Sequence, residues 1–140
     1  MSGLVHDTIT GQVVGYGIAG PVKWIYDPAD PHAVMMDLSV LCTEPEQQGQ
    51  VVQWTFARSI LVRGLVGGQA GIGDVRITRN GPWLDIALTS PDGHGVFRFP
   101  AATLHRFVVR TERVVLIGDE SRHMAATLDD AVARLLGGVS

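Results

Sequence analysis

The sequence predicts an α+β fold, in which runs of antiparallel strands are followed by helices. Residues 4 to 56 consist of β-branched and apolar runs separated by turn residues, and a helical pattern begins only at residue 57. The second half repeats this order, with strands first and helices from residue 101 onward. Strands and helices grouped in this way are typical of α+β domains, whereas parallel α/β folds alternate the two.

The length and composition predict one domain that covers residues 1–140 and has a partner subunit. A chain of 140 residues is long enough to bury a core without disulfides or metals. Hydrophobic residues make up 46% of the chain and charged residues 18%, against a usual charged share of roughly 25%. Part of the apolar surface is therefore expected to be covered by another subunit.

The cellular setting is predicted from the cysteine content, the N-terminus and the charge. Cys42 is the single cysteine, so an internal disulfide is impossible and a reducing compartment is expected. No signal-peptide pattern or apolar run of membrane-spanning length is present, which predicts a soluble cytoplasmic protein. The formal net charge of −3 argues against nucleic acid as the main partner.

The first half is predicted to contain four strands. The first three are Leu4–Val14, Val22–Tyr26 and Ala33–Leu41, and the prolines of the turn Asp27–Pro31 separate the last two. A polar loop at Glu44–Gly49 leads to the fourth strand.

The fourth strand is predicted to pass directly into a helix. Residues 51 to 56 alternate, with Val52, Trp54 and Phe56 on the side expected to face the core. The spacing becomes helical from Phe56, which predicts a helix through Arg63. The glycine-rich segment that follows, residues 68–73, is predicted to be a flexible link, because it lacks the lysine and hydroxyl of a phosphate-binding loop.

Three strands are predicted in the second half, at Asp74–Arg79, Trp83–Thr89 and Val96–Phe99. Asn80-Gly81 predicts a tight type I′ hairpin between the first two. The segment Ser90–Gly93 predicts a second turn, since it holds proline and glycine at positions that turns favour.

Two helices complete the chain. The first is predicted from Ala101 to about Arg113, and the second from Thr127 or Leu128 to Leu136, ending at Gly137-Gly138. One face of the first helix is apolar and is predicted to face the core, through Leu104, Phe107, Val108 and Thr111.

The opposite face of that helix carries Arg106, Arg110 and Arg113, at spacings of i, i+4 and i+7. Two interpretations remain open for this arginine stripe. It is a solvated face or one paired with Asp129 and Asp130, or it is an electropositive surface that meets an acidic partner protein.

No residue pattern predicts a catalytic, metal or cofactor site. No two of the five histidines are three or four residues apart, so the usual spacing of zinc ligands is absent. Asp74 and Arg76 alternate on a predicted strand, and we expect them to form a structural ion pair with a neighbour such as Arg58.

Several motifs occur together in a specific order. They are residues 26–34 (YDPADPHAV), 52–58 (VQWTFAR), 64–65 (GL), 71–76 (GIGDVR), 90–93 (SPDG), Phe107 and 110–111 (RT). In this order and spacing they resemble the SsgA-like proteins of filamentous actinomycetes, a family that controls sporulation-specific cell division. The resemblance extends from Tyr26 to about Leu136.

The resemblance implies a fold similar to the whirly single-strand-binding domains, with two packed antiparallel sheets that carry helices, and a trimeric assembly. It implies an adaptor without catalysis, which helps to place or activate the division GTPase FtsZ at septa or acts on another family member. It also singles out motif residues expected to support the structure, namely Asp27, Asp30, Trp54, Phe56, Arg58, Gly73, Asp74, Arg76, Ser90, Asp92 and Gly93.

One alternative function follows from the same fold, namely binding of single-stranded nucleic acid. Trp24, Trp54 and Trp83 could stack on bases, and the arginine stripe could contact phosphates. Composition argues against this function, because Lys23 is the single lysine and Trp54 alternates toward the core. A shared fold does not carry a shared function.

Overall fold

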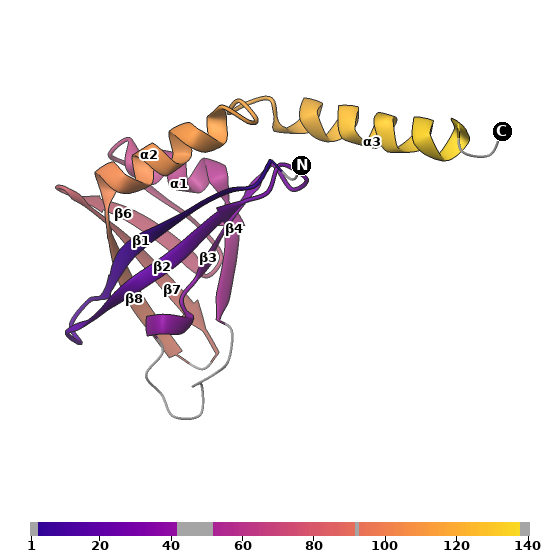
Figure 1. Cartoon of the computed structure of the whole chain (residues 1–140). Helices are drawn as coiled ribbons and strands as arrows, with labels where there is room; N and C mark the ends of the chain where they lie inside the picture. The colour runs from indigo at the N-terminus through magenta and orange to yellow at the C-terminus, as the bar shows by residue number, and fades with distance from the viewer. Residues whose placement is uncertain (1–2, 42–51, 92, 138–140) are drawn as a thin grey trace.

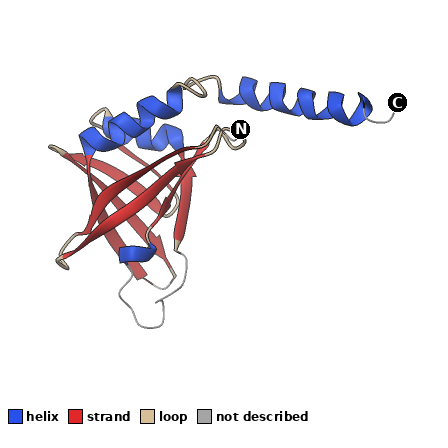
Figure 2. Cartoon of the chain, viewed as in Figure 1, coloured by secondary structure: helices blue, strands red, loops and turns tan. Residues whose placement is uncertain are grey.

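A computed structural model describes residues 3–41, 52–91 and 93–137. In this part of the chain, eight strands form one antiparallel sheet with the order β4-β3-β2-β1-β8-β7-β6-β5. The sheet curls into a half-barrel, with α1 and α2 covering one end and α3 extending away from it (Figure 1, Figure 2). The predicted α+β class is confirmed, with helices placed at one end of an antiparallel sheet.

The predicted division into two packed sheets is not confirmed, because hydrogen bonds connect all eight strands. Two four-stranded halves are nevertheless recognisable. They are joined where β1 meets β8, and the register there covers only two residue pairs, Gln12 with Arg98 and Val13 with Phe97. The ladder between β1 and β8 is therefore the shortest in the sheet.

The first half contains the four predicted strands, with different limits. They are β1 (Val5–Val13), β2 (Ile18–Tyr26), β3 (Ala33–Asp37) and β4 (Gln53–Ala57). β2 begins four residues earlier than predicted, because Pro21 lies opposite Thr10 in the ladder without ending the strand. β3 ends at Asp37, whose carboxylate accepts a hydrogen bond from the Ser39 backbone N–H (2.9 Å) and starts the 3-10 helix Ser39–Leu41. The predicted loop Glu44–Gly49 lies outside the described residues.

The direct passage from strand to helix is confirmed. β4 ends at Ala57 and α1 (Arg58–Leu65) begins at the next residue. The Arg58 backbone N–H donates to the His32 carbonyl oxygen at 2.7 Å, which fixes the start of the helix to the turn before β3. The side chain of Arg58 is thereby directed into the space beneath the helices.

The predicted flexible link at residues 68–73 is wrong in part, because it contains a strand. Strand β5 (Gln69–Ile72) pairs with β6 (Val75–Asn80) through four residue pairs and buries Ala70. The sequence pattern does not predict this strand, because Gly71 and Gly73 interrupt the alternation of apolar residues. Gly73 has a φ of +55° in the turn between the two strands, a conformation that favours glycine.

The predicted hairpin between β6 and β7 (Trp83–Ser90) is confirmed, but its turn type is wrong. Asn80 pairs with Trp83, so the two loop residues are Gly81 and Pro82. Gly81 has a φ of +59°. Pro82 cannot follow it into the positive φ that a type I′ turn requires at both loop residues. Glycine at the first loop position instead matches a type II′ turn.

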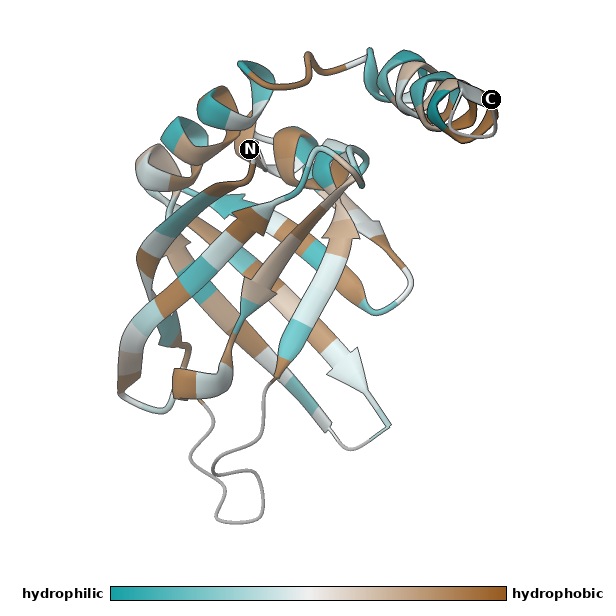
Figure 3. Cartoon of the chain, turned by 45° about the vertical axis from the view of Figure 1, so that its right-hand side comes forward, coloured by the Kyte–Doolittle hydropathy of each residue, from teal (hydrophilic) through white to brown (hydrophobic). Residues whose placement is uncertain are grey.

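The last strand and the helix after it position the arginine stripe. Strand β8 (Gly93–Pro100) leads directly into α2 (Ala101–Glu112), and Pro100 stands at its N-terminal boundary. The predicted apolar face of α2 is buried as expected. Hydrophobic residues alternate with polar ones along the strands and pack beneath α1 and α2 (Figure 3).

The last helix is longer than predicted. α3 runs from Glu120 to Gly137, so it begins about seven residues before the predicted start. The sequence pattern around residues 120 to 126 is alanine-rich and gives no clear apolar face, which is why its start was placed too late. Its apolar residues are exposed in the described part of the chain, and Leu128 is 64% exposed.

Gly64 in α1 provides a test of the packing between this helix and the sheet. A Cβ atom at this position would lie closer to Ile77 Cγ2 than two carbon atoms can approach. Alanine gains about 1 kcal/mol of helix propensity over glycine, but overpacking costs about 1 to 3 kcal/mol. We therefore expect Gly64→Ala to lower the melting temperature, whereas Gly68→Ala, whose Cβ would have an ordinary contact, should not. Equal melting of the two variants would contradict this packing.

Candidate functional site

The arginine stripe lies on the exposed face of α2, opposite its buried apolar residues, as predicted. Arg110 pairs with Asp7 at 3.4 Å and donates to the His6 carbonyl oxygen at 3.2 Å. Arg106 donates to the Thr103 hydroxyl at 3.3 Å. In the part of the chain that the structure describes, no carboxylate forms an ion pair with Arg106 or Arg113.

The predicted pairing of the stripe with Asp129 and Asp130 is wrong. Asp130 pairs within its own helix with Arg134, at 2.9 Å. α3 extends away from α2 (Figure 1), and among the described residues no ion pair joins either aspartate to the stripe. The stripe consequently presents positive charge to the solvent.

A second cluster of polar groups lies buried between α1, α2 and the start of α3, around Arg58. The side chain of Arg58 is 0% exposed, and its Nη2 donates to Glu120 Oε2 at 2.8 Å. Its Nη1 donates to the Val115 carbonyl oxygen at 2.8 Å and to the Thr111 hydroxyl at 3.2 Å. The guanidinium carbon lies 4.7 Å from the centre of the Tyr26 ring, within cation–π range.

The Arg58 cluster connects four separate parts of the chain. Arg58 comes from the strand-to-helix junction, Tyr26 from the end of β2, Thr111 from α2, and Glu120 from the start of α3. In the connection between α2 and α3, Arg58 donates to the Val115 carbonyl oxygen at 2.8 Å and more weakly to the Leu116 carbonyl oxygen at 3.4 Å. The cluster therefore holds the α2–α3 junction against the sheet.

We predicted that Asp74 and Arg76 form an ion pair with a neighbour such as Arg58, and within the described residues no such pair is present. Asp74 and Arg76 are both exposed, in the β5–β6 turn and on β6. The true partner, Glu120, was missed. It is 62 residues away in sequence and no motif marks it, so only the folded chain brings the two charges together.

The pKa of Glu120 is lowered by its surroundings. Burial raises the pKa of this carboxyl, but the hydrogen bond from Arg58 and the backbone N–H groups of Glu120 and Gly118 outweigh burial. Gly118 N–H donates to Glu120 Oε1 at 2.7 Å. The folded state consequently favours the carboxylate.

Stability should therefore depend on pH through Glu120. Its folded pKa lies below the usual pKa of a glutamate carboxyl, so its contribution to stability is complete above the usual pKa and is lost as the pH falls through the folded pKa. We expect unfolding in urea between pH 6 and about pH 3 to show a smaller decrease in stability for Glu120→Gln than for the parent chain. A decrease of the same size in both would mean that other carboxyls account for it.

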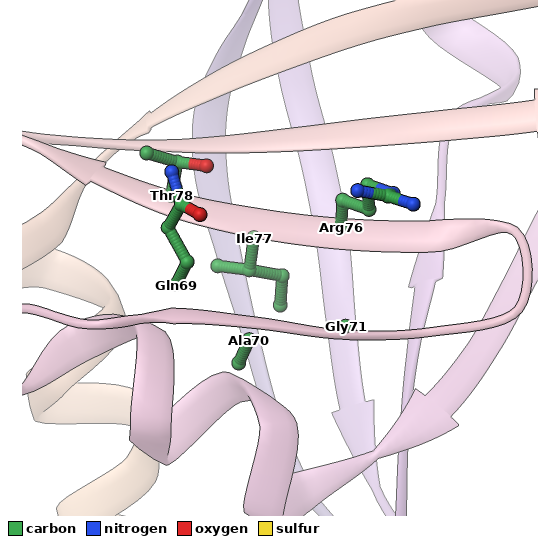
Figure 4. Close-up of a pocket in the computed structure, with 6 residues that line it drawn as sticks. All are labelled: Gln69, Ala70, Gly71, Arg76, Ile77 and Thr78. Atoms are coloured by element: carbon green, nitrogen blue, oxygen red, sulfur yellow. The ribbon is translucent and has the colours of Figure 1, made fainter.

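A small pocket lies beside β5 and β6, with a volume of about 160 Å³. Figure 4 shows Gln69 and Thr78 close together at one end of it and Arg76 farther along β6. Ligand pockets usually measure roughly 300 to 1,000 Å³. The pocket is too small for a typical cofactor, and its lining contains no acid–base pair.

Comparison with known proteins identifies the family. Residues 21–120 match the family model described as Streptomyces sporulation and cell division protein, SsgA. The match includes the strand-to-helix junction, the arginine stripe and the Arg58 cluster up to Glu120. The chain belongs to the SsgA family.

Relatives in the SsgA family are similar over most of the chain. The sporulation-specific cell division protein SsgB of Salinispora tropica is 46% identical over 117 residues, which cover 81% of this chain and 77% of that protein. A crystal structure of an SsgA-like sporulation-specific cell division protein from Thermobifida fusca has a TM-score of 0.75 and 27% identity, and covers 94% of this chain and 96% of that one.

A second solved structure concerns SsgB, in work that relates mutations in SsgB to longitudinal cell division during sporulation of Streptomyces coelicolor. It has a TM-score of 0.72 and 33% identity, and covers 88% of this chain and 97% of that one. These likenesses confirm the family resemblance predicted from the motifs and the curled antiparallel fold with helices.

The SsgA-family motif residues are dispersed over the structure. Asp27 Oδ1 accepts from the Ala29 N–H at 2.9 Å, and the Asp27 carbonyl oxygen accepts from the Asp30 N–H at 2.9 Å, so both residues shape the turn before β3. Ser90 pairs with Gly93 at the closed end of the β7–β8 hairpin. Asp92 lies outside the described residues. These positions stabilise turns.

The aromatic motif residues of the SsgA family differ in burial. Phe56 is buried and contacts Trp24 edge to face, with ring centres 6.1 Å apart. Trp54 lies on the core side of β4 as predicted, but it is only half-buried. Among the motif residues, Arg58 alone stands at the centre of a buried polar cluster.

Within residues 3–41, 52–91 and 93–137, no group of three or more His, Cys, Asp or Glu side chains could hold a metal ion. No helix described in the structure is both long and apolar enough to cross a membrane.

Proposed function

We propose that this chain is a non-enzymatic adaptor of sporulation-specific cell division, acting as a single SsgA-like domain without a metal or cofactor. Its partner is a protein of the division machinery, either the GTPase FtsZ or another SsgA-like protein. It resides in the cytoplasm and is recruited to division septa, where it helps to place or activate FtsZ. The names of its relatives support the cell division role.

The observation that carries this proposal is the arginine stripe on α2. One face of α2 is buried in the core, and the opposite face exposes Arg106, Arg110 and Arg113. Positive charge at such a surface increases the association rate and the specificity for an acidic protein. It is not balanced by the carboxylates of α3, which the sequence offered as an alternative.

The alternative of nucleic-acid binding has weaker support. Trp24 is completely buried and cannot stack on a base, and Trp54 and Trp83 are half-buried. Single-strand binders combine accessible aromatic rings with basic residues along a groove. The arginines lie on α2 and at its end, whereas Trp54 and Trp83 lie on β4 and β7.

The assembly and the fold type complete the proposal. The native state is a homotrimer, which is compatible with the apolar residues exposed on α3 and near residues 114–117. The fold is whirly-like in this proposal, which is compatible with the two four-stranded halves of the sheet. Light scattering coupled to size exclusion tests the assembly, and a monomer mass at micromolar concentration would contradict it.

Charge reversal of the stripe tests the partner surface. Arg106→Glu, Arg110→Glu and Arg113→Glu together should weaken retention of FtsZ or of an SsgA-like protein at least tenfold in a pull-down, more strongly at low than at moderate salt. The fold should survive, because the exposed Arg110–Asp7 pair contributes only about 0 to 1 kcal/mol. Arg63→Glu, Arg76→Glu and Arg122→Glu together are the matched control, since these arginines are also exposed.

Unchanged binding by a folded triple variant would show that the stripe is only a solvated face. The double variant Arg106→Glu, Arg110→Glu, which retains Arg113, should also weaken partner binding, because it removes two of the three positive charges of the stripe. In sporulating filaments, a fluorescent fusion of the parent chain should gather at septa. A diffuse signal would contradict the adaptor role itself.

A further inference from the structure

The apolar face of α3 has no partner within the part of the chain that the structure describes. Met124, Leu128, Val132 and Leu135 recur at helical spacing and are exposed by 45%, 64%, 45% and 72%. These four residues, here called the α3 stripe, occupy one side of the helix, with charged residues on the other side. A helix that extends from the body and exposes such a face needs a surface to cover it.

A second exposed apolar patch lies at the junction between α2 and α3. Val109 at the end of α2 is 37% exposed, and Val114, Leu116 and Ile117 in the connection are exposed by 40%, 60% and 38%. Arg113 borders this patch, here called the junction patch. Because Arg58 holds the carbonyl oxygens of Val115 and Leu116, the patch has a fixed shape before any partner arrives.

The charges around the two surfaces are complementary. On a helix with 100° between residues, Asp129 falls beside the apolar side of α3, and within the described residues it forms no ion pair with a cation. Arg113 borders the junction patch and has no carboxylate partner there either. An apolar centre with oppositely charged residues at its rim is the usual composition of a protein interface.

We propose that the α3 stripe of one copy docks on the junction patch of a second copy of this chain, with Asp129 of the first facing Arg113 of the second. This inference rests on the self-association included in the proposed function, and it specifies that the α3 stripe and the junction patch form the contact. Within one chain, the extended course of α3 keeps the two surfaces apart. The contact joins two different surfaces, so repetition around an axis can close a ring.

A membrane surface fits the α3 stripe less well. Helices that lie on membranes carry an excess of lysine and arginine on their polar face. α3 contains two arginines, at positions 122 and 134, against three acidic residues, at positions 120, 129 and 130. This balance favours a protein partner over anionic lipid.

The test introduces charge into the stripe and measures mass by light scattering after size exclusion. Leu128→Asp with Leu135→Asp should convert the oligomer to a monomer at concentrations where the parent chain remains assembled. Ala126→Asp with Ala133→Asp adds the same charge to the opposite side of α3 and should keep the parent mass. All four positions are exposed, so thermal melting should show that the body stays folded.

A charge exchange identifies the second surface. Asp129→Arg and Arg113→Asp should each weaken association at least threefold, and the two together should restore it. The proposal is overturned if the Leu128, Leu135 variant keeps the parent mass, if the control variant dissociates equally, or if the exchange gives no restoration. It is also overturned if the parent chain is a monomer that binds anionic vesicles through α3.

These outcomes are separate from those of the adaptor function. If the Leu128, Leu135 variant keeps the mass of the parent chain, the copies associate through another surface. Loss of FtsZ binding by the Arg106, Arg110 double variant, with its mass unchanged, would support the adaptor role whatever covers α3.

Discussion

Arg58→Met should lower the free energy of unfolding by about 3 to 5 kcal/mol, the usual cost of removing one partner from a buried ion pair. The substitution leaves the carboxylate of Glu120 without its counter-charge in a nearly buried position. It also removes the side-chain donor to the Val115 carbonyl oxygen. Chemical denaturation at neutral pH measures the effect.

Two variants make this expectation specific. Arg98→Met breaks the partly exposed pair with Asp85 and should cost less than Arg58→Met, because solvent screens that pair. The double variant Arg58→Met, Glu120→Met removes both buried charges and should recover part of the lost stability, since replacing a whole buried pair is often near neutral. An Arg58→Met variant within about 1 kcal/mol of the parent would show that the cluster does not hold the junction.

Trp24→Ala should destabilise the chain by about 3 to 5 kcal/mol through the cavity that it leaves. Trp24 is completely buried between the sheet and α2, and its ring lies 5.2 Å from that of Phe99 and 6.0 Å from that of Phe107. It therefore connects β2, β8 and α2 in one aromatic cluster. Thermal and denaturant unfolding measure the loss.

Trp54→Ala provides the comparison, because Trp54 is half-buried and should cost less than Trp24→Ala. Trp24→Phe should be milder than either truncation, since phenylalanine fills most of the space and removes an indole N–H that has no hydrogen-bond partner within the described chain. A larger loss for Trp54→Ala than for Trp24→Ala would place the centre of the core at β4 instead of β2.

The difference between these two tryptophans shows the limit of periodicity. Alternation correctly placed Trp54 on the inner side of β4, but it does not reveal how deeply a side chain lies. β4 is an edge strand, whereas β2 lies inside the sheet with neighbours on both sides. Depth depends on which strands are neighbours, and that is decided by the tertiary structure.

The sequence by itself determined the strand runs, the helix after β4, the amphipathic faces of α2 and the family, because each depends on residues close together in the chain or on motifs in fixed order. Only the tertiary structure decided that β1 pairs with β8, that Arg58 meets Glu120, and that α3 leaves its apolar side exposed. The first two features join residues that are tens of positions apart in the sequence. The third depends on whether another part of the structure covers α3. Local spacing and composition carry no record of either, so the Arg58 cluster and the α3 stripe became visible only in the folded chain.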